Sequence, residues 1–240
     1  MEPQAPSNDG PVGHGRCYEE VLRLLEALPR GRVLDAPAGD GGLGARIAEK
    51  GFEVVLVDID PKANRTQLPC LAADLNCPLP FPDASFDVVV CSEGIEHIAH
   101  PHGLMAEIAR VLKPEGHLVL TFPNICSMKG RMNFLLESRL ASFGDFTEDA
   151  SQGFLKAPGH VNPIPYVEVR HLLNKNGFEI VSLGTDRMRY RWHPVSVLLG
   201  WLIRRRTRIK NPYHADLLSP ALLYGDHVVL VARRTQRATR

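Results

Sequence analysis

Two carboxylates and two glycines near the N-terminus have the spacing of a nucleotide site. Asp35 ends a first apolar run, and Gly39 and Gly41 follow it in a short turn. A second apolar run, residues 54–57, ends in Asp58. A strand, a tight glycine turn, a helix and a second strand ending in an acid would place these groups at the carboxyl edge of a parallel sheet. The pattern therefore favours enzymes that use an adenosine-containing cofactor.

The glycine turn is compatible with two cofactor chemistries. Residues 39–44 satisfy the dinucleotide pattern GxGxxG, and Asp58 stands 19 residues beyond Gly39, so an NAD(P)-dependent oxidoreductase is a rival interpretation. In that fingerprint the first glycine follows the strand almost at once, whereas here Asp35 ends the strand and three residues separate it from Gly39. An acid at this point suits an ammonium better than a pyrophosphate. We therefore favour S-adenosylmethionine, which carries an ammonium and no phosphate.

A second group of polar residues follows the expected fourth strand. Glu93, Glu96 and His97 are spaced i, i+3 and i+4, so a helix beginning after Ser92 would place all three on one face. Two carboxylates and an imidazole can hold a divalent cation, and His160 could provide a fourth ligand. Two alternatives stay open. His97 could act as a general base on a hydroxyl acceptor, or the Glu and His could only tie the helix to the following loop.

Composition indicates one soluble α/β domain. The chain has 240 residues, 44% hydrophobic and 23% charged, with a formal net charge of +1, so no global basic field points to nucleic acid. Its five cysteines form no CxxC pair, which is typical of a reducing cytosol. Residues 1–15 are polar and rich in Pro and Gly, and we expect a disordered arm there, followed by a single domain over residues 16–240.

Strands and helices are expected to alternate as far as residue 123, which predicts βαβ units and a parallel sheet. The expected strands are residues 32–36, 52–57, 69–73, 86–91, 116–122, 178–183 and 224–233, and the expected helices are residues 17–28, 43–50, 103–113, 125–136 and 165–175. Residues 124–163 form an insert that is a candidate lid. Residues 186–223 form a helical excursion, after which the last strand could insert antiparallel.

The excursion combines an apolar stretch with many arginines. Residues 195–203 are apolar and contain Trp201, and basic residues flank them on both sides. Nine residues are too few to span a bilayer, which needs about 20. A basic amphipathic helix here could lie at a membrane surface through residues 194–210. The alternative, slightly favoured, is a helix packed over the sheet or at a dimer contact.

The motifs together resemble those of class I S-adenosylmethionine-dependent methyltransferases, in particular small-molecule enzymes of the ubiquinone and menaquinone pathways and methyltransferase domains of types 11 and 23. The matching segments are Val33-Leu34-Asp35-Ala36-Pro37-Ala38-Gly39-Asp40-Gly41, Val57-Asp58-Ile59-Asp60, Ala73-Asp74-Leu75, Leu79-Pro80-Phe81-Pro82-Asp83-Ala84-Ser85-Phe86-Asp87-Val88-Val89, Glu93-Gly94-Ile95-Glu96-His97-Ile98 and Leu112-Lys113-Pro114-Glu115-Gly116-His117-Leu118. The resemblance implies a Rossmann-like, seven-stranded methyltransferase sheet with helices on both faces, plus the lid-like insert.

The resemblance also implies roles for single residues. Asp35 would orient the glycine turn, Asp58 would accept hydrogen bonds from the ribose, and Asp74 would meet the adenine amino group. The predicted cofactor-binding residues are Asp35, Gly39, Gly41, Asp58, Ile59, Asp74, Leu75 and Ser92. One residue departs from the family pattern, because Pro37 stands where glycine is usual.

Similar Glu and His spacing occurs in ubiquinone-pathway O-methyltransferases and in small-RNA 2′-O-methyltransferases. In the small-RNA enzymes these residues bind a metal. The resemblance therefore makes His97 and Glu93 the expected catalytic residues, and Glu93, Glu96, His97 and His160 the expected metal ligands. The expected function is O-methylation of a small or lipid-linked acceptor by a cytoplasmic enzyme with S-adenosylmethionine as cofactor. Nucleic acid is not expected as a partner. An NAD(P)-dependent oxidoreductase and a non-catalytic cofactor-binding scaffold remain alternatives.

Overall fold

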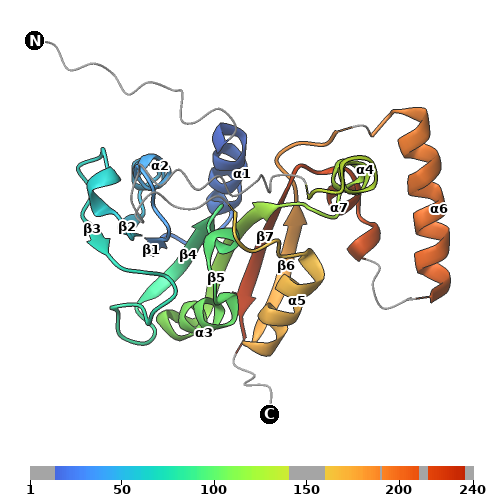
Figure 1. Ribbon diagram of the computed structural model, residues 1–240. Coiled ribbons are helices and arrows are strands. Elements are labelled where there is room, and N and C mark those ends of the chain that lie inside the picture. Colours follow the sequence, from blue (N-terminus) through green and yellow to red (C-terminus); the bar gives the residue numbers. More distant parts are fainter. Residues whose placement is uncertain (1–13, 141–159, 190, 211–215, 236–240) are drawn as a thin grey trace, which may run out of the picture.

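Seven strands form one sheet in the order β3-β2-β1-β4-β5-β7-β6 (Figure 1). The computed structural model describes residues 14–140, 160–189, 191–210 and 216–235. The strands are β1 (Arg32–Asp35), β2 (Glu53–Asp58), β3 (Cys70–Ala72), β4 (Phe86–Ser92), β5 (Leu112–Pro123), β6 (Phe178–Gly184) and β7 (His227–Arg234). The strand order reverses between β1 and β4, and ligands of open α/β sheets bind at such a switch point.

The predicted sheet is confirmed, including its last strand. β1 pairs in parallel with β2 and β4, and β4 pairs in parallel with β5. β7 inserts between β5 and β6 and is antiparallel to both. The carboxyl ends of β1, β2 and β4 therefore meet at one edge, and the first residues of β7 join them there because β7 runs the opposite way.

Helices cover both faces of the sheet. α1 (His14–Glu26) and α2 (Gly42–Glu49) pack on one face, and α3 (Pro101–Val111) and α5 (Tyr166–Lys175) pack on the other (Figure 1). Successive strand residues alternate between the two cores, so Val33 packs with the first helix pair and Leu34 with the second. These buried apolar layers hold the strand ends in fixed positions.

Two sequence predictions near the edge were wrong. Residues 93–97 do not form an α-helix; only a 3₁₀ turn, η2 (Ile95–His97), follows β4. The reason is local, because Glu93 has a φ of +48°, which no helix accommodates. The fifth strand is also longer than predicted and begins at Leu112, so that Pro114 lies within it and not beyond a helix end.

The remaining elements lie beyond one end of the sheet. α4 (Met128–Glu137) begins at Ser127, whose side chain accepts a hydrogen bond from the Gly130 amide. α6 (Pro194–Lys210) and α7 (Pro220–Tyr224) belong to the excursion, and α6 stands apart from the sheet (Figure 1). In the described part of the chain, no helix is both long and apolar enough to cross a membrane.

Parts of the predicted insert and arm fall outside the described residues. Residues 141–159 of the insert and 1–13 of the arm are not described, so the predictions of a lid and of a disordered arm stay predictions. Residues 14 and 15, predicted as the end of the arm, already belong to α1.

Candidate functional site

The loop after β1 is held by the carboxylate that ends β2. The Gly39 amide donates to Oδ2 of Asp58 at 2.8 Å, and the Asp60 amide donates to Oδ1 at 3.0 Å. The Ala38 amide also donates to the Val57 carbonyl at 2.9 Å. Each carboxylate oxygen accepts one of these bonds and keeps a free lone pair. Asp58 thus fixes the turn and still has acceptor capacity for a ligand hydroxyl.

The two predicted glycines are required for different reasons. Gly39 has a φ of +54°, and a Cβ added to it would meet no atom within 4 Å, so open space adjoins its backbone. Gly41 has a φ of +79° and is the N-cap of α2, and a Cβ there would collide with Oδ1 of Asn64. Gly39 therefore borders a cradle that a ligand could fill, whereas the packing of the protein itself requires Gly41.

Asp35 is fully buried at the end of β1. In the described structure neither of its carboxylate oxygens has a hydrogen-bond partner of good geometry. Burial raises the pKa of Asp35 to about 8, although the backbone of Gly44 opposes the shift, and the nearby Asp58 adds to it. The carboxyl is therefore neutral at pH 7 unless a cation comes close to it.

Pro37 packs against the loop that follows β4. A Cβ added to Gly94 would collide with the Pro37 ring. The proline that replaces the usual glycine of the family pattern is therefore accommodated by a glycine across the switch point, and the two loops are in direct contact.

The other predicted cofactor residues lie at the same edge. Asp74 accepts hydrogen bonds from the backbone and side-chain nitrogens of Asn76, at 2.8 and 2.9 Å, and Leu75 is buried. Ile59 is 58% exposed directly after Asp58, which is unusual for a large apolar side chain and suits contact with a flat ligand ring. Ser92 is buried, with its hydroxyl 3.1 Å from that of Thr121.

Three of the four predicted metal ligands lie together. Glu96, His97 and His160 each offer a ligand atom within 4.8 Å of the others, and Nε2 of His160 is 3.8 Å from Oε1 of Glu96. The amides of Val161 and Asn162 donate to the Glu96 carbonyl at 3.0 and 2.9 Å, which brings the end of the insert to η2. The proximity arises from this pairing and not from the helix that the sequence predicted.

Glu96 has no exposed surface, and neither of its carboxylate oxygens has a hydrogen-bond partner in the described residues. Burial, followed by the negative charge of Glu93, raises the pKa of Glu96 well above its usual range. A cation held beside the two imidazoles would reverse that shift, so the residues present fit a divalent ion.

Glu93, the fourth predicted ligand, is bound mainly to a different set of residues. Thr121 donates to its Oε1 at 2.8 Å, and Nε2 of His227 lies 3.5 Å from its Oε2. Sγ of Cys17 lies 3.8 Å from Oε1 of Glu93. The Glu93 amide also donates to Thr121, which stabilises the left-handed backbone at this residue.

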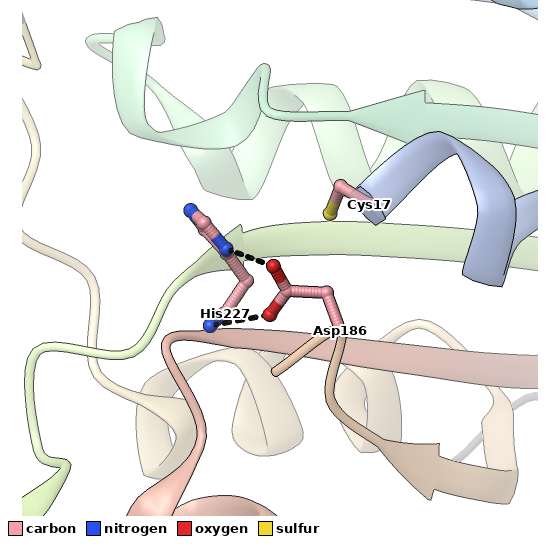
Figure 2. Close-up of side chains that lie close together, drawn as sticks. All are labelled: Cys17, Asp186 and His227. Carbon is pink, nitrogen blue, oxygen red and sulfur yellow. Dashed lines mark hydrogen bonds and ion pairs between the residues drawn. The ribbon is translucent and has the colours of Figure 1, made fainter. Parts of the chain in front are cut away.

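His227, Asp186 and Cys17 were missed by sequence reasoning. Figure 2 shows Asp186 between the other two, with its carboxylate 2.9 Å from Nδ1 of His227. Burial alone would lower the pKa of His227, but Asp186 and Glu93 raise it to about 9. The imidazolium therefore links two carboxylates at pH 7. The three residues come from distant chain segments and carry no motif, so no local signal could have revealed them.

A sequence model described as a methyltransferase domain matches residues 13–183 of this chain. The chain belongs to this methyltransferase family. The predicted recognition as a class I S-adenosylmethionine-dependent methyltransferase is thus confirmed, and with it the enzyme class and the cofactor. The nicotinamide alternative loses its support.

Curated relatives of this methyltransferase match less than half of the chain. A demethylmenaquinone methyltransferase of Renibacterium salmoninarum is 37% identical over 106 residues, which are 42% of this chain and 44% of that protein. An uncharacterized methyltransferase of Mycobacterium tuberculosis is 39% identical over 109 residues, or 43% of this chain and 44% of that protein. The match thus spans less than half the length of either relative.

Solved structures share the methyltransferase fold. A SAM-dependent methyltransferase of Archaeoglobus fulgidus gives a TM-score of 0.58 at 18% identity, covering 90% of this chain and 94% of that one. A protein of Pyrococcus horikoshii gives 0.60 at 18% identity, covering 95% and 94%. At this identity the similarity shows the fold alone.

The contacts of Asp58 predict how its loss would act on cofactor binding. Asp58→Ala removes both the clamp on the Gly39 amide and the predicted ribose acceptor. We expect S-adenosylhomocysteine to bind about 10- to 100-fold more weakly by calorimetry, the scale of losing charge-assisted hydrogen bonds. Asp60→Ala is the matched control and should leave the affinity unchanged. Unaltered affinity of a folded Asp58→Ala protein would remove Asp58 from the binding site.

Asp35 predicts a pH dependence of stability. Its folded-state pKa lies above that of the unfolded chain, so the unfolded state loses the proton first as the pH rises. The contribution of the neutral, buried Asp35 carboxyl to the free energy of unfolding is fully present below about pH 4. It is lost as the pH rises toward 8, by at most about 1.4 kcal/mol per pH unit. Asp35→Asn should flatten this decline in urea unfolding from pH 5 to 8, whereas Asp60→Asn should not.

Proposed function

We propose that this methyltransferase transfers a methyl group from S-adenosylmethionine to a hydroxyl oxygen of a lipid-linked, quinol-type acceptor. The observation that carries the proposal is the group formed by Glu96, His97 and His160, which adjoins the carboxyl end of β4 and the switch point of the sheet. The names of the menaquinone-pathway relatives support a quinone-type acceptor.

Methyl transfer to oxygen requires removal of a proton from the acceptor. The sulfonium of the cofactor supplies an activated methyl group, so the protein contributes mainly positioning and the acceptance of a proton. His97 is half-buried, and its ring lies edge-on to that of His160 with the centroids 4.9 Å apart. Imidazole is the side chain that most often serves as a general base in proton transfer. In the proposal His97 accepts the hydroxyl proton, and Glu93 positions the hydroxyl.

The alternative to proton acceptance by His97 is that the same residues hold a divalent ion. Glu96, His97 and His160 would be its ligands, with Glu93 as the fourth, and the ion would lower the pKa of a bound hydroxyl. Glu96 supports this alternative, because it is buried beside two imidazoles and, among the described residues, no group donates a hydrogen bond to either of its oxygens.

A direct assay tests the reaction. The purified protein with S-adenosylmethionine and a short-chain hydroquinone should yield a methoxy product, identified by mass spectrometry and NMR. His97→Gln should lower turnover about 100-fold or more, the usual contribution of a general base, with little change in S-adenosylhomocysteine affinity. His102→Gln is the control, because His102 is exposed and pairs with Glu168 at 3.4 Å. A ring-methylated product, or full turnover in His97→Gln, would contradict the assignment.

A separate measurement tests the ion. Titration with Mn²⁺ should show a binding site in the wild-type protein, and a chelator should lower turnover. Glu96→Gln should abolish Mn²⁺ binding, yet leave the metal-free protein at least as stable at pH 7, because the wild-type carboxyl is already neutral there. Glu107→Gln serves as a control acid away from the cluster. If the wild-type protein binds no divalent ion, the metal site is wrong and Glu96 has only a structural role.

A further inference from the structure

The more apolar face of α6 is exposed to solvent. The outward residues of the helix are Val195 at 53%, Leu198 at 58%, Trp201 at 54% and Leu202 at 45% exposure. In a helix that packs on its own protein, the apolar stripe faces inward. The helix therefore does not pack over the sheet, which was one of the two sequence predictions for it, and only its other face is covered, by α7.

The inward face of α6 is narrow and rests on α7. Tyr224 of α7 is buried, and its hydroxyl donates to the Ser196 carbonyl at 3.4 Å. A side chain at Gly200 would collide with that hydroxyl, so glycine lets the helix approach closely. Leu199 and Ile203 complete the contact as partly buried residues. This stripe fixes the helix and leaves the larger apolar side chains outside.

Both tryptophans of the chain lie in this region, and both are exposed. Trp192 is 82% exposed, and the guanidinium of Arg191 lies 4.9 Å from its ring centroid. The guanidinium of Arg205 lies 5.6 Å from the ring of Trp201. Tryptophan beside arginine, next to exposed leucines, is typical of segments that lie in the interface of a lipid bilayer.

The charge of the segment has one sign. Between Asp186 and Asp216 the sequence contains no acidic residue. Its basic residues are Arg187, Arg189, Arg191, Arg204, Arg205, Arg206, Arg208 and Lys210. The whole chain carries only +1, so positive charge is concentrated on the segment that bears the exposed apolar face.

We propose that the outward face of α6, with Trp192, docks on a membrane surface that contains anionic phospholipid. Such a surface offers both an apolar layer for Leu198 and Trp201 and negative charge for the arginines. A second copy of this chain fits less well, because a symmetric contact would bring two strongly positive segments together. Nucleic acid would match the arginines but not the exposed leucines and valines. The proposal goes beyond the proposed function and does not depend on the identity of the acceptor.

α4 adds a second exposed apolar run to the same helical unit. Phe134, Leu135 and Leu136 are 60%, 74% and 73% exposed. α4 joins α6 and α7 through Met128, which packs in the cluster that also holds Leu223 and Tyr224. Exposed apolar side chains therefore recur on two of the three helices that stand beyond the sheet (Figure 1).

Vesicle binding tests the proposal on the full-length protein. Vesicles of phosphatidylcholine with phosphatidylglycerol should cosediment the protein and shift its tryptophan fluorescence to the blue, and pure phosphatidylcholine should do so far less. Since the two tryptophans of the sequence are Trp192, just before α6, and Trp201, within it, and both are exposed, the fluorescence reports on this region. The double variant Leu198→Ser/Trp201→Ser should weaken vesicle binding at least about tenfold, since binding scales with the apolar area buried. Arg205→Gln and Arg206→Gln should weaken it about fivefold each.

Matched variants keep the test specific. Val181→Ser removes an apolar residue that is 50% exposed on β6, and Arg30→Gln removes a guanidinium 4.6 Å from the ring of Phe52. Neither should change vesicle binding. Cofactor affinity measured in parallel shows that the variants are folded and keeps this result separate from the methyltransferase assay. Equal binding to anionic and neutral vesicles, no binding to either, or a dimer that dissociates in Leu198→Ser/Trp201→Ser would each overturn the proposal.

Discussion

Two buried carboxyls that form no ion pair with a Lys or Arg of the described residues determine the chemistry at the carboxyl edge of the sheet. Asp35 ends β1 and Glu96 follows β4, the strands between which the strand order reverses. In the described structure no Lys or Arg forms an ion pair with either one, and burial raises the pKa of both. A buried charge without a partner is costly, so such groups stay neutral until a cation arrives. The edge is therefore suited to a cationic cofactor tail on one side and a divalent ion on the other.

The other acids of the edge hold backbone in place. Asp58 accepts a hydrogen bond from the Gly39 amide in the turn after β1. Glu93 accepts a hydrogen bond from the Thr121 hydroxyl and lies 3.5 Å from Nε2 of His227. His227 begins β7, which reaches the edge only because that strand is antiparallel. The C-terminal strand thus has a double role: it completes the sheet, and it supplies the charge that holds Glu93 after β4. In this way the sheet topology determines the electrostatics of the site.

Short-range patterns in the sequence predicted the sheet and the cofactor turn because both depend on neighbouring residues. Alternating apolar runs and the glycine spacing are local signals, and the alternation of strands with helices predicted a parallel sheet. The Glu and His cluster was found for the wrong reason, since Glu93 adopts a left-handed backbone that ends any helix there. Asp186, His227 and Cys17 could not be predicted, because residues far apart in the chain meet only through the antiparallel insertion of β7.

The same excursion carries both α6 and part of the site. It begins at Asp186, which pairs at 2.9 Å with His227, the first residue of β7 beyond the excursion. The chain segments at its two ends are joined where the Asp226 amide donates to the Arg187 carbonyl at 2.9 Å and the Arg189 amide donates to the Tyr224 carbonyl at 2.7 Å. The base of the excursion is therefore joined to the edge of the sheet that holds Glu93, and α6 contacts that base through Tyr224, whose hydroxyl donates to the Ser196 carbonyl at 3.4 Å. If the outward face of α6 lies on a bilayer, these contacts connect the lipid surface to the edge that holds the site, which suits an acceptor with a lipid tail.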